Sequence, residues 1–261
     1  MNIDIEEIVR IAVDAGREIL KIYNDGEEDI QSWQKADKSP LTAADMAAHN
    51  LIMERLLKAY PAIPVISEES ASLPYEERKN YEYCWMVDPL DGTKEFINRN
   101  GDFTVNIALI EKNKPVAGVI FVPVTGASYY AVEGKGAYSL KGNYREKLKA
   151  PPFYMDEKGL KIVGSRSHMN DETHKYLSQF KDAQLVAKGS SLKFMMIAEG
   201  EAHLYPRIAP TMEWDTAAAQ AILEESGGHV IDFEFSKPLV YNKENLLNPH
   251  FVALGNHIRN D

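Results

Sequence analysis

The segment "YCWMVDPLDGTKEF", residues Tyr83–Phe96, joins a run of strand-forming residues to two closely spaced carboxylates. Its first five residues, 83–87, are aromatic, sulfur-containing or β-branched, and such a run favours a buried strand. Pro89 cannot donate a hydrogen bond to a neighbouring strand, so we expect the strand to stop near Asp88.

The two carboxylates at the end of this strand indicate a candidate metal site. Asp88 and Asp91 bracket the backbone carbonyl of Leu90, and these oxygens form a compact set of hard ligands suited to Mg²⁺. Gly92 and Thr93 follow, and their backbone N–H groups would face an anion at the start of the next segment. A plain turn is the alternative, because Asp-Pro and Asp-Gly are both common turn dipeptides.

Composition limits the class of protein. The 261 residues are 44% hydrophobic and 26% charged, which is ordinary for a globular chain that forms one large domain or two modest ones. The net charge of -10 argues against general affinity for nucleic acids or acidic membranes. The lone cysteine, Cys84, excludes an intramolecular disulfide, and we expect it to be a buried small hydrophobe.

The sequence carries no sign of export or of membrane insertion. The N-terminal "MNIDIEEIVR" lacks the apolar core of a signal peptide. No apolar run approaches the roughly 20 residues that span a bilayer. We therefore expect a cytoplasmic protein without an integral membrane segment.

Helices and then strands are predicted for residues 1–150. Apolar spacing predicts a helix from about Ile5 to Tyr23 with Asp4 as its N-cap, and a second from Thr42 to about Tyr60. "IPVIS" is predicted as a short strand. "FTVNIALIEK", "KPVAGVIFVPV" and "ASYYAVEG" predict an antiparallel meander, which makes this part an α+β domain.

The pattern changes after "KLKAPPFYMDEKG", which we interpret as a domain boundary. From there predicted strands alternate with predicted helices: "LKIVGS", "DETHKYLSQF", "AQLVAKG", "SSLKFMMIAEG", "AHLYP" and "EWDTAAAQAILEESGG". "HVIDF" and "FVALGN" follow as strands. This alternation predicts an α/β domain over residues 151–261.

Further acidic residues lie at the ends of predicted elements. Glu68 and Glu69 follow the strand "IPVIS", Asp45 lies in the first turn of the second helix, and Asp215 lies at the start of "EWDTAAAQAILEESGG". Each has an ordinary alternative: a solvated loop for the glutamates, a capping box with Thr42 for Asp45, and an N-cap for Asp215. If side chains at these ends meet, three or more carboxylates and a carbonyl would form a multi-magnesium phosphate site.

Three of these motifs together resemble the Mg²⁺-dependent, lithium-sensitive phosphomonoesterase superfamily of inositol monophosphatases. "DPLDGTKEF", "SEES" and "WDTAAAQAILEESGG" carry the resemblance, which extends from the first helix to "FVALGN". "SPLTAADMAAH", "DPLDGTKEFINRNGDFTVNIALI" and "GSSLKF" are most similar to the bacterial 3'(2'),5'-bisphosphate nucleotidases of sulfate assimilation. Where inositol monophosphatases usually continue "DGT" with Thr-Asn-Phe, this chain has Lys94, Glu95 and Phe96.

The resemblance implies a layered α/β/α/β/α sandwich with the site between its two domains. It implies that two or three Mg²⁺ ions are bound by Glu68, Asp88, Asp91, Asp215 and the carbonyl of Leu90. It also implies that Asp45 and Thr93 activate the attacking water. Glu69 would lie beyond these ligands or bind a weaker additional metal.

A bisphosphorylated nucleotide also needs cations away from the metals. Lys193 lies in the first turn of the helix predicted for "SSLKFMMIAEG", where a cation opposes the helix dipole unless an anion binds nearby. Ser190 would assist it, and Arg207 is the second candidate cation; two surface cations are the alternative. The resemblance further implies substrate contacts for Glu68, Leu90, Asp91, Gly92, Thr93 and Asp215. It leaves open whether His168 touches the nucleotide.

The reaction implied by the resemblance is hydrolysis of the 3'-phosphate of adenosine 3',5'-bisphosphate to AMP and phosphate. The sulfated analogue, 3'-phosphoadenylyl sulfate, would be a second substrate. An inositol or sugar phosphatase stays open as an alternative, and so does a non-catalytic Mg²⁺-dependent nucleotide sensor, which would not need Asp45 and Thr93. Lithium sensitivity, a monomeric or homodimeric state and weak association with the inner face of the cell membrane also stay open.

Overall fold

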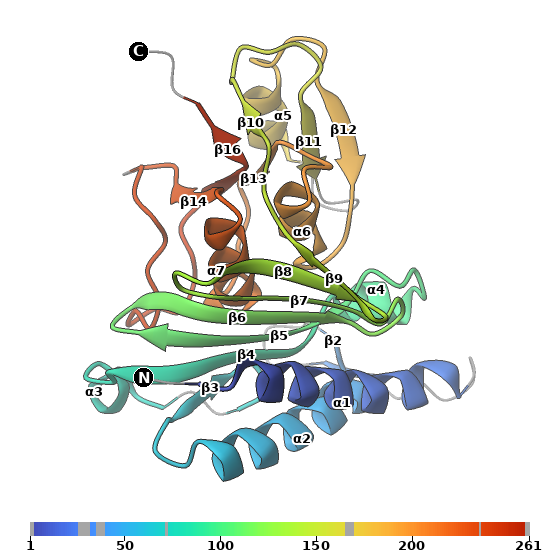
Figure 1. Ribbon diagram of the computed structural model, residues 1–261, viewed down its shortest axis with the longest axis vertical. Coiled ribbons are helices and arrows are strands. Elements are labelled where there is room, and N and C mark those ends of the chain that lie inside the picture. Colours follow the sequence, from blue (N-terminus) through green and yellow to red (C-terminus); the bar gives the residue numbers. More distant parts are fainter. Residues whose placement is uncertain are drawn as a thin grey trace.

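The computed structural model describes residues 3–25, 32–34, 40–70, 73–164, 170–234 and 236–258. Their helices and sheets form alternating layers (Figure 1). Helices α1 and α2 cover one face of a seven-stranded sheet, and α6 and α7 lie between that sheet and a five-stranded sheet. Helix α5 packs on the outer face of the second sheet. The predicted α/β/α/β/α order is confirmed.

The two helices of the first layer begin and end where the sequence predicts. Helix α1 spans Ile5–Asn24, and the side chain of its N-cap, Asp4, accepts hydrogen bonds from the first-turn amides. Helix α2 spans Ala43–Ala59 and has Thr42 as its N-cap. Their apolar faces pack on the seven-stranded sheet, so the charged residues of α1 are left on the solvent side.

The seven-stranded sheet has the order β3-β4-β5-β6-β7-β8-β9. Its strands are β3 (Val65–Ser67), β4 (Tyr83–Asp91), β5 (Thr104–Glu111), β6 (Lys114–Val122), β7 (Ala127–Val132), β8 (Gly136–Lys141) and β9 (Tyr144–Lys147). Strand β3 pairs parallel with β4, and every later pair is antiparallel. The predicted meander is therefore confirmed, and β8 and β9 extend it.

The prediction that the strand of residues 83–87 stops near Asp88 is wrong. Strand β4 continues through Pro89 and ends at Asp91. Its register on β5 shifts between Asp88, which pairs with Asn106, and Asp91, which pairs with Thr104. A β-bulge leaves the extra residue unpaired, so the missing N–H of proline costs no ladder hydrogen bond there.

The described residues of the second part of the chain form a mixed sheet and three α-helices. The sheet order is β12-β11-β13-β15-β14, in which β11 is parallel to β12 and β13, and β15 is antiparallel to β13 and β14. The strands are β11 (Lys161–Gly164), β12 (Gln184–Ala187), β13 (Leu204–Arg207), β14 (His229–Asp232) and β15 (Phe251–Leu254). The helices are α5 (Asp171–Leu177), α6 (Leu192–Ala198) and α7 (Ala217–Glu225). The predicted alternation is confirmed.

Shorter elements complete the described structure. They are β1 (Ser32–Gln34), β2 (Pro40–Thr42), α3 (Tyr75–Arg78), α4 (Thr93–Ile97), β10 (Pro152–Phe153), a 3₁₀-helix (Glu213–Asp215) and β16 (Asn256–His257). Helix α4 follows Gly92, whose φ of 95° lies in the region that favours glycine. This turn ends β4 and starts α4 directly beside the paired carboxylates.

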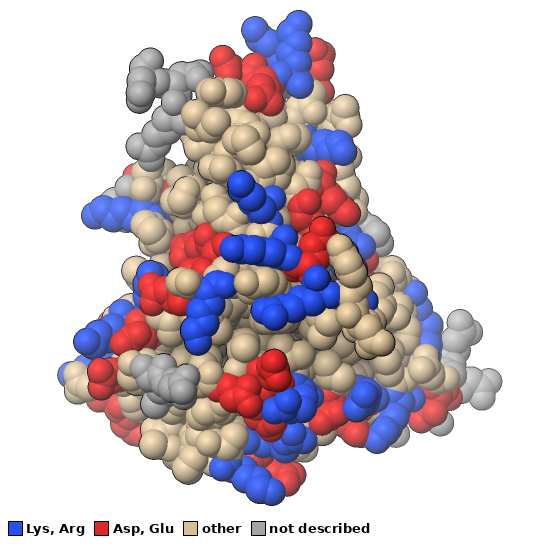
Figure 2. All heavy atoms as spheres, in the orientation of Figure 1, with Lys and Arg blue, Asp and Glu red and all other residues tan. Residues whose placement is uncertain are grey.

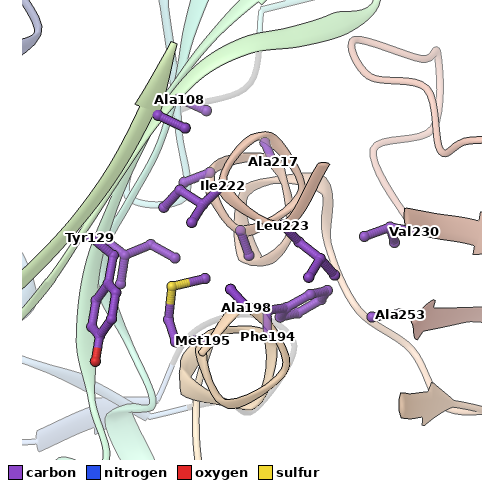
Figure 3. Packing of buried hydrophobic residues seen from close by; sticks show 14 of the residues in the cluster. Ala108, Tyr129, Phe194, Met195, Ala198, Ala217, Ile222, Leu223, Val230 and Ala253 are labelled. Atoms are coloured by element: carbon purple, nitrogen blue, oxygen red, sulfur yellow. The ribbon is translucent and has the colours of Figure 1, made fainter. Parts of the chain in front are cut away.

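One hydrophobic cluster joins the two sheets through α6 and α7. Figure 3 shows Met195 and Ala198 on α6 beside Ile222 and Leu223 on α7. Helix α7 packs closely on β6, because a Cβ atom at Gly118 would lie 2.4 Å from a backbone oxygen of that helix. The division into domains 1–150 and 151–261 stays a prediction, since this cluster draws residues from both parts.

The described surface and core agree with the composition. Cys84 is buried, with an exposed fraction of 2%, as the sequence predicts. Lys and Arg side chains are interspersed with Asp and Glu on the face that Figure 2 shows. Within the described ranges, every helix is too short or too polar to cross a membrane.

Candidate active site

Four carboxylates from three separate segments meet at the end of β4. Burial raises the pKa of Asp88 well above its usual range, and the negative charges of Glu68, Asp91 and Asp215 raise it further. Burial likewise raises the pKa of Asp215, and the negative charges of Asp91 and Glu68 raise it further. Asp215 ends the 3₁₀-helix, where it accepts a hydrogen bond from the amide of Met212 at 2.9 Å. The N-cap of α7 is Thr216, so Asp215 is not the predicted N-cap of that helix.

This donor set fits a divalent cation such as Mg²⁺. Buried carboxylates that repel one another are stabilised when a cation binds between them, and oxygen-only ligands suit Mg²⁺. No group of three or more His, Cys, Asp and Glu residues meets the geometry of a metal site among the described residues.

Asp45 and Thr93, predicted as a pair, lie within hydrogen-bonding distance. Thr93 Oγ1 donates to Asp45 Oδ1 at 3.3 Å and approaches the carbonyl oxygen of Leu90 at 3.5 Å. The other carboxylate oxygen, Asp45 Oδ2, accepts from Thr42 N at 2.8 Å and from Thr42 Oγ1 at 2.5 Å. The predicted capping box is thus present, and the same carboxylate reaches the candidate site through its second oxygen.

Asp91 is bound by the turn that precedes α6. Its Oδ2 accepts hydrogen bonds from Ser190 Oγ and from Ser191 N, both at 2.6 Å. Ser190 therefore holds a candidate metal ligand, in addition to the substrate contact that the sequence predicts for it.

Lys193 and Arg207 lie in one cavity with these acids. The cavity has a volume of about 130 Å³, and its lining includes Asp91, Asp215, Lys193 and Arg207. Lys193 Nζ donates to the carbonyl of Ser190 at 2.6 Å, and burial lowers the pKa of Lys193 to about 8. Lys193 and Arg207 therefore lie together in one cavity and are not two separate surface cations.

Arg207 is held by its own turn. Its Nε donates to Thr211 Oγ1 and its Nη2 donates to the carbonyl of Pro210, both at 2.8 Å. Its positive charge lowers the pKa of Lys193, while the negative charge of Asp91 opposes that effect. Two cations that repel each other in one cavity favour a bound anion.

Comparison with known proteins identifies the family. The sequence profile of the Inositol monophosphatase family matches residues 4–259. The chain belongs to this family. It is 47% identical over 248 residues, 95% of this chain and 98% of the other, to the 3'(2'),5'-bisphosphate nucleotidase CysQ of Salmonella typhimurium. The CysQ nucleotidase of Haemophilus influenzae is 36% identical over 253 residues, 96% and 92% of the two chains.

Solved structures of family members have the same fold. The crystal structure of CysQ from Bacteroides thetaiotaomicron is 42% identical, with a TM-score of 0.84 over 96% of each chain. An inositol monophosphatase of Thermotoga maritima is 21% identical, with a TM-score of 0.76 over 97% of this chain and 92% of that one, and supports the fold alone. Phosphatases of the inositol monophosphatase family depend on metal ions, generally Mg²⁺.

Glu69 and His168 are the two residues whose roles the sequence left open. Glu69 is half-buried. Burial lowers the pKa of His49 on α2, and the negative charge of Glu69 partly opposes that lowering. His168 lies outside the described residues.

Sequence reasoning missed several polar residues near the family site. Ser191, Thr104 and Asn106 contact Asp91 or its partners, and Lys94 and Glu95 line the cavity. One signal was available: Thr104 and Asn106 are polar residues two positions apart in a strand that is otherwise apolar up to Ile110, so they share one face.

Proposed function

We propose that this protein is a Mg²⁺-dependent 3'(2'),5'-bisphosphate nucleotidase. It hydrolyses the 3'-phosphate of adenosine 3',5'-bisphosphate to AMP and phosphate, and the 3'-phosphate of 3'-phosphoadenylyl sulfate offers the same reacting group. The observation that carries the proposal is the shared cavity, which is lined by Asp91 and Asp215 and also by Lys193 and Arg207. A substrate with one phosphate would use the first pair only. The names of the CysQ relatives agree with this choice.

The candidate metal ligands would hold the Mg²⁺ ions of the reaction. They are Glu68, Asp88, Asp91, Asp215 and the carbonyl oxygen of Leu90, and we propose that they bind two or three ions. Bound Mg²⁺ supplies positive charge that stabilises the reacting phosphate and lowers the pKa of water. The backbone amides of Gly92 and Thr93 would contact the same phosphate, together with the side chains of the ligands.

Asp45 and Thr93 would act on the attacking water. Thr93 Oγ1 donates to Asp45 Oδ1, and its oxygen accepts a hydrogen bond from the water, which it orients toward phosphorus for in-line attack. As the water attacks, its proton passes to Thr93 Oγ1 while the proton of Thr93 moves to Asp45 Oδ1, so Asp45 is the general base and Thr93 is left unchanged. A nucleotide sensor without catalysis would have no use for this contact.

Lys193 and Arg207 would bind the 5'-phosphate, assisted by Ser190. Because that phosphate does not react, the two cations contribute binding and orientation rather than chemistry. The proposal includes a cytoplasmic protein that is monomeric or homodimeric.

Phosphate release from three substrates tests this function. Adenosine 3',5'-bisphosphate, adenosine 3'-monophosphate and inositol 1-phosphate are compared at equal concentration, with Mg²⁺ and with EDTA. We expect the highest kcat/KM on the bisphosphate and no turnover in EDTA. A preference for inositol 1-phosphate would establish the sugar phosphatase instead, and the absence of turnover on all three would favour the sensor.

A further inference from the structure

Strand β5 carries two buried polar side chains that the proposed reaction does not use. Thr104 and Asn106 have exposed fractions of 0% and 1% in a strand that is otherwise apolar up to its last residue, Glu111. Both lie on one face of the strand, next to the register shift that follows Asp88. A buried polar group is costly unless it is hydrogen-bonded, so the partners of these two side chains indicate their purpose.

The partners of Thr104 come from the turn that precedes α6. Thr104 Oγ1 lies 2.6 Å from Ser190 Oγ and 2.8 Å from Ser191 Oγ, and it also reaches Asn106 Oδ1 at 3.0 Å. Ser191 Oγ donates to Asn106 Oδ1 at 3.0 Å. These four side chains form one hydrogen-bonded network, named here the β5–α6 network, between the first sheet and the second part of the chain.

Asp91 sets the direction of the hydrogen bonds in the β5–α6 network. An ionised carboxylate only accepts, so the single proton of Ser190 Oγ points to Asp91 Oδ2. The single proton of Thr104 Oγ1 is then donated either to Asn106 Oδ1 or to Ser190 Oγ, and Ser191 Oγ donates to Asn106 Oδ1 or to Thr104 Oγ1. Each donor in turn strengthens the next, because hydrogen bonds in a chain polarise one another.

Three donors, two from the network side chains and one from the backbone of Ser191, reach the same carboxylate oxygen of Asp91. Besides Ser190 Oγ, Asp91 Oδ2 accepts from Ser191 N at 2.6 Å and from Asn106 Nδ2 at 3.4 Å. These hydrogen bonds restrain Asp91 Oδ2, so Oδ1 is the oxygen that we assign to cation binding.

The same turn also contacts Lys193, the cation that is assigned to the second phosphate. Ser190 has a φ of 54°, an unusual conformation for a residue other than glycine, and its carbonyl accepts from Lys193 Nζ at 2.6 Å. The turn cannot shift easily, because a Cβ atom at Gly189 would lie 2.7 Å from Glu95 Cγ and 2.8 Å from Asp102 Cβ. Ser190 thus contacts both Asp91, through its hydroxyl, and Lys193, through its carbonyl.

We propose that Thr104 and Asn106 are positioning residues, which hold Asp91 and Ser190 in one arrangement so that Mg²⁺ binding and binding of the second phosphate favour each other. The inference rests on the proposed function, since it assigns Asp91 to the metal and Lys193 to the 5'-phosphate. Coupling of this kind is reciprocal: Mg²⁺ raises the affinity for the bisphosphate, and the bisphosphate raises the affinity for Mg²⁺ by the same factor.

Thr104→Val tests the proposal, because valine keeps the shape of threonine and removes the hydroxyl. The first readout is the Mg²⁺ dissociation constant of the nucleotide-free protein, measured by calorimetry. We expect Mg²⁺ binding to weaken about 10–100-fold, the usual effect of removing a group that orients a ligand. We also expect Thr104→Ser, which restores the hydroxyl, to bind Mg²⁺ nearly as well as the wild type.

The second readout separates coupling from simple damage. In the wild type, KM for adenosine 3',5'-bisphosphate should fall as Mg²⁺ rises, whereas KM for adenosine 3'-monophosphate should change less. In Thr104→Val this difference between the two substrates should disappear. Ser191→Ala, which keeps the backbone donor to Asp91, should change the same quantities in the same direction by a smaller factor.

Thr173→Val is the matched control, because it removes another buried hydroxyl, which donates to Asn170 Oδ1 at 2.6 Å at the start of α5. It should leave Mg²⁺ affinity and both KM values unchanged. Folded Thr104→Val and Ser191→Ala proteins with wild-type Mg²⁺ affinity and KM values would overturn the inference. If the wild type does not hydrolyse the bisphosphate, the proposed function fails by itself, and calorimetry still decides whether Thr104 positions a Mg²⁺ ligand.

Discussion

Thr93 and Asp45 are joined by a hydrogen bond of 3.3 Å between Thr93 Oγ1 and Asp45 Oδ1, although they lie 48 positions apart in the chain. The two oxygens of Asp45 have different partners. Oδ2 accepts from Thr42 at the start of α2, and Oδ1 accepts from Thr93 beside the candidate metal ligands. One side chain therefore stabilises a helix and extends into the candidate active site.

Asp45→Asn should separate these two roles. An amide cannot act as a general base, so we expect turnover per folded molecule to fall by roughly 10²–10⁴-fold, with Mg²⁺ and substrate binding largely retained. Steady-state kinetics and calorimetry on the same preparation measure both. Asp4→Ala is the control, since it removes the N-cap side chain of α1, which does not contact Asp45, and should cost about 1 kcal/mol of stability with little loss of turnover. Normal activity of Asp45→Asn would mean that Asp45 only caps α2.

Asp91→Asn should abolish turnover and most of the stabilisation by Mg²⁺. A ligand at 100 times its dissociation constant stabilises a protein by about 2.7 kcal/mol, so Mg²⁺ should raise the Tm of the wild type clearly. The variant should show almost no increase when melting curves are recorded with Mg²⁺ and with EDTA. Asp182→Asn, an exposed site away from the cavity, should behave as the wild type. Near-normal activity of Asp91→Asn would contradict the metal assignment.

Asp88→Asn should change stability in opposite directions with and without metal. Burial and the charges of Glu68, Asp91 and Asp215 disfavour the ionised form of Asp88, which is why its pKa is raised. Neutralising Asp88 should therefore raise the Tm in EDTA above that of the wild type and remove most of the increase that Mg²⁺ causes. A variant that is less stable than the wild type in EDTA would show that the repulsion among these carboxylates is unimportant.

Lys193→Ala and Arg207→Ala should impair binding of the bisphosphate selectively. A charge-assisted hydrogen bond contributes about 1.5–3 kcal/mol, or roughly 10–150-fold in affinity, so KM for adenosine 3',5'-bisphosphate should rise by that factor. Hydrolysis of adenosine 3'-monophosphate should change little, and Lys175→Ala on α5 should affect neither substrate. Equal losses on both substrates would indicate a structural role.

The pH dependence of the wild-type KM tests the assignment of Lys193 to the 5'-phosphate. Because burial lowers the pKa of Lys193 to about 8, its ammonium is lost as the pH rises through that value. KM for the bisphosphate should therefore increase between about pH 7 and pH 9, while KM for the monophosphate stays level. A bisphosphate KM that does not change over this range would exclude Lys193 as the principal phosphate contact.

The sequence by itself determined the principal helices and strands and the order of the acidic motifs along the chain. Apolar spacing and end signals located α1 and α2 within a residue or two, and alternating turn signals located the meander, because these features depend on neighbours along the chain. The end of β4 was misjudged at Pro89, since a β-bulge depends on the partner strand and not on local sequence.

Only the tertiary structure decided which distant side chains meet. Asp91 is bound by Ser190 and Ser191, which follow 99 and 100 positions later, and no local rule predicts that contact. The sequence also offered capping and catalysis as alternatives for Asp45, whereas in the fold one carboxylate oxygen accepts from Thr42 and the other accepts from Thr93. Periodicity predicts which residues share a face, but strand register and layer packing decide what that face contacts.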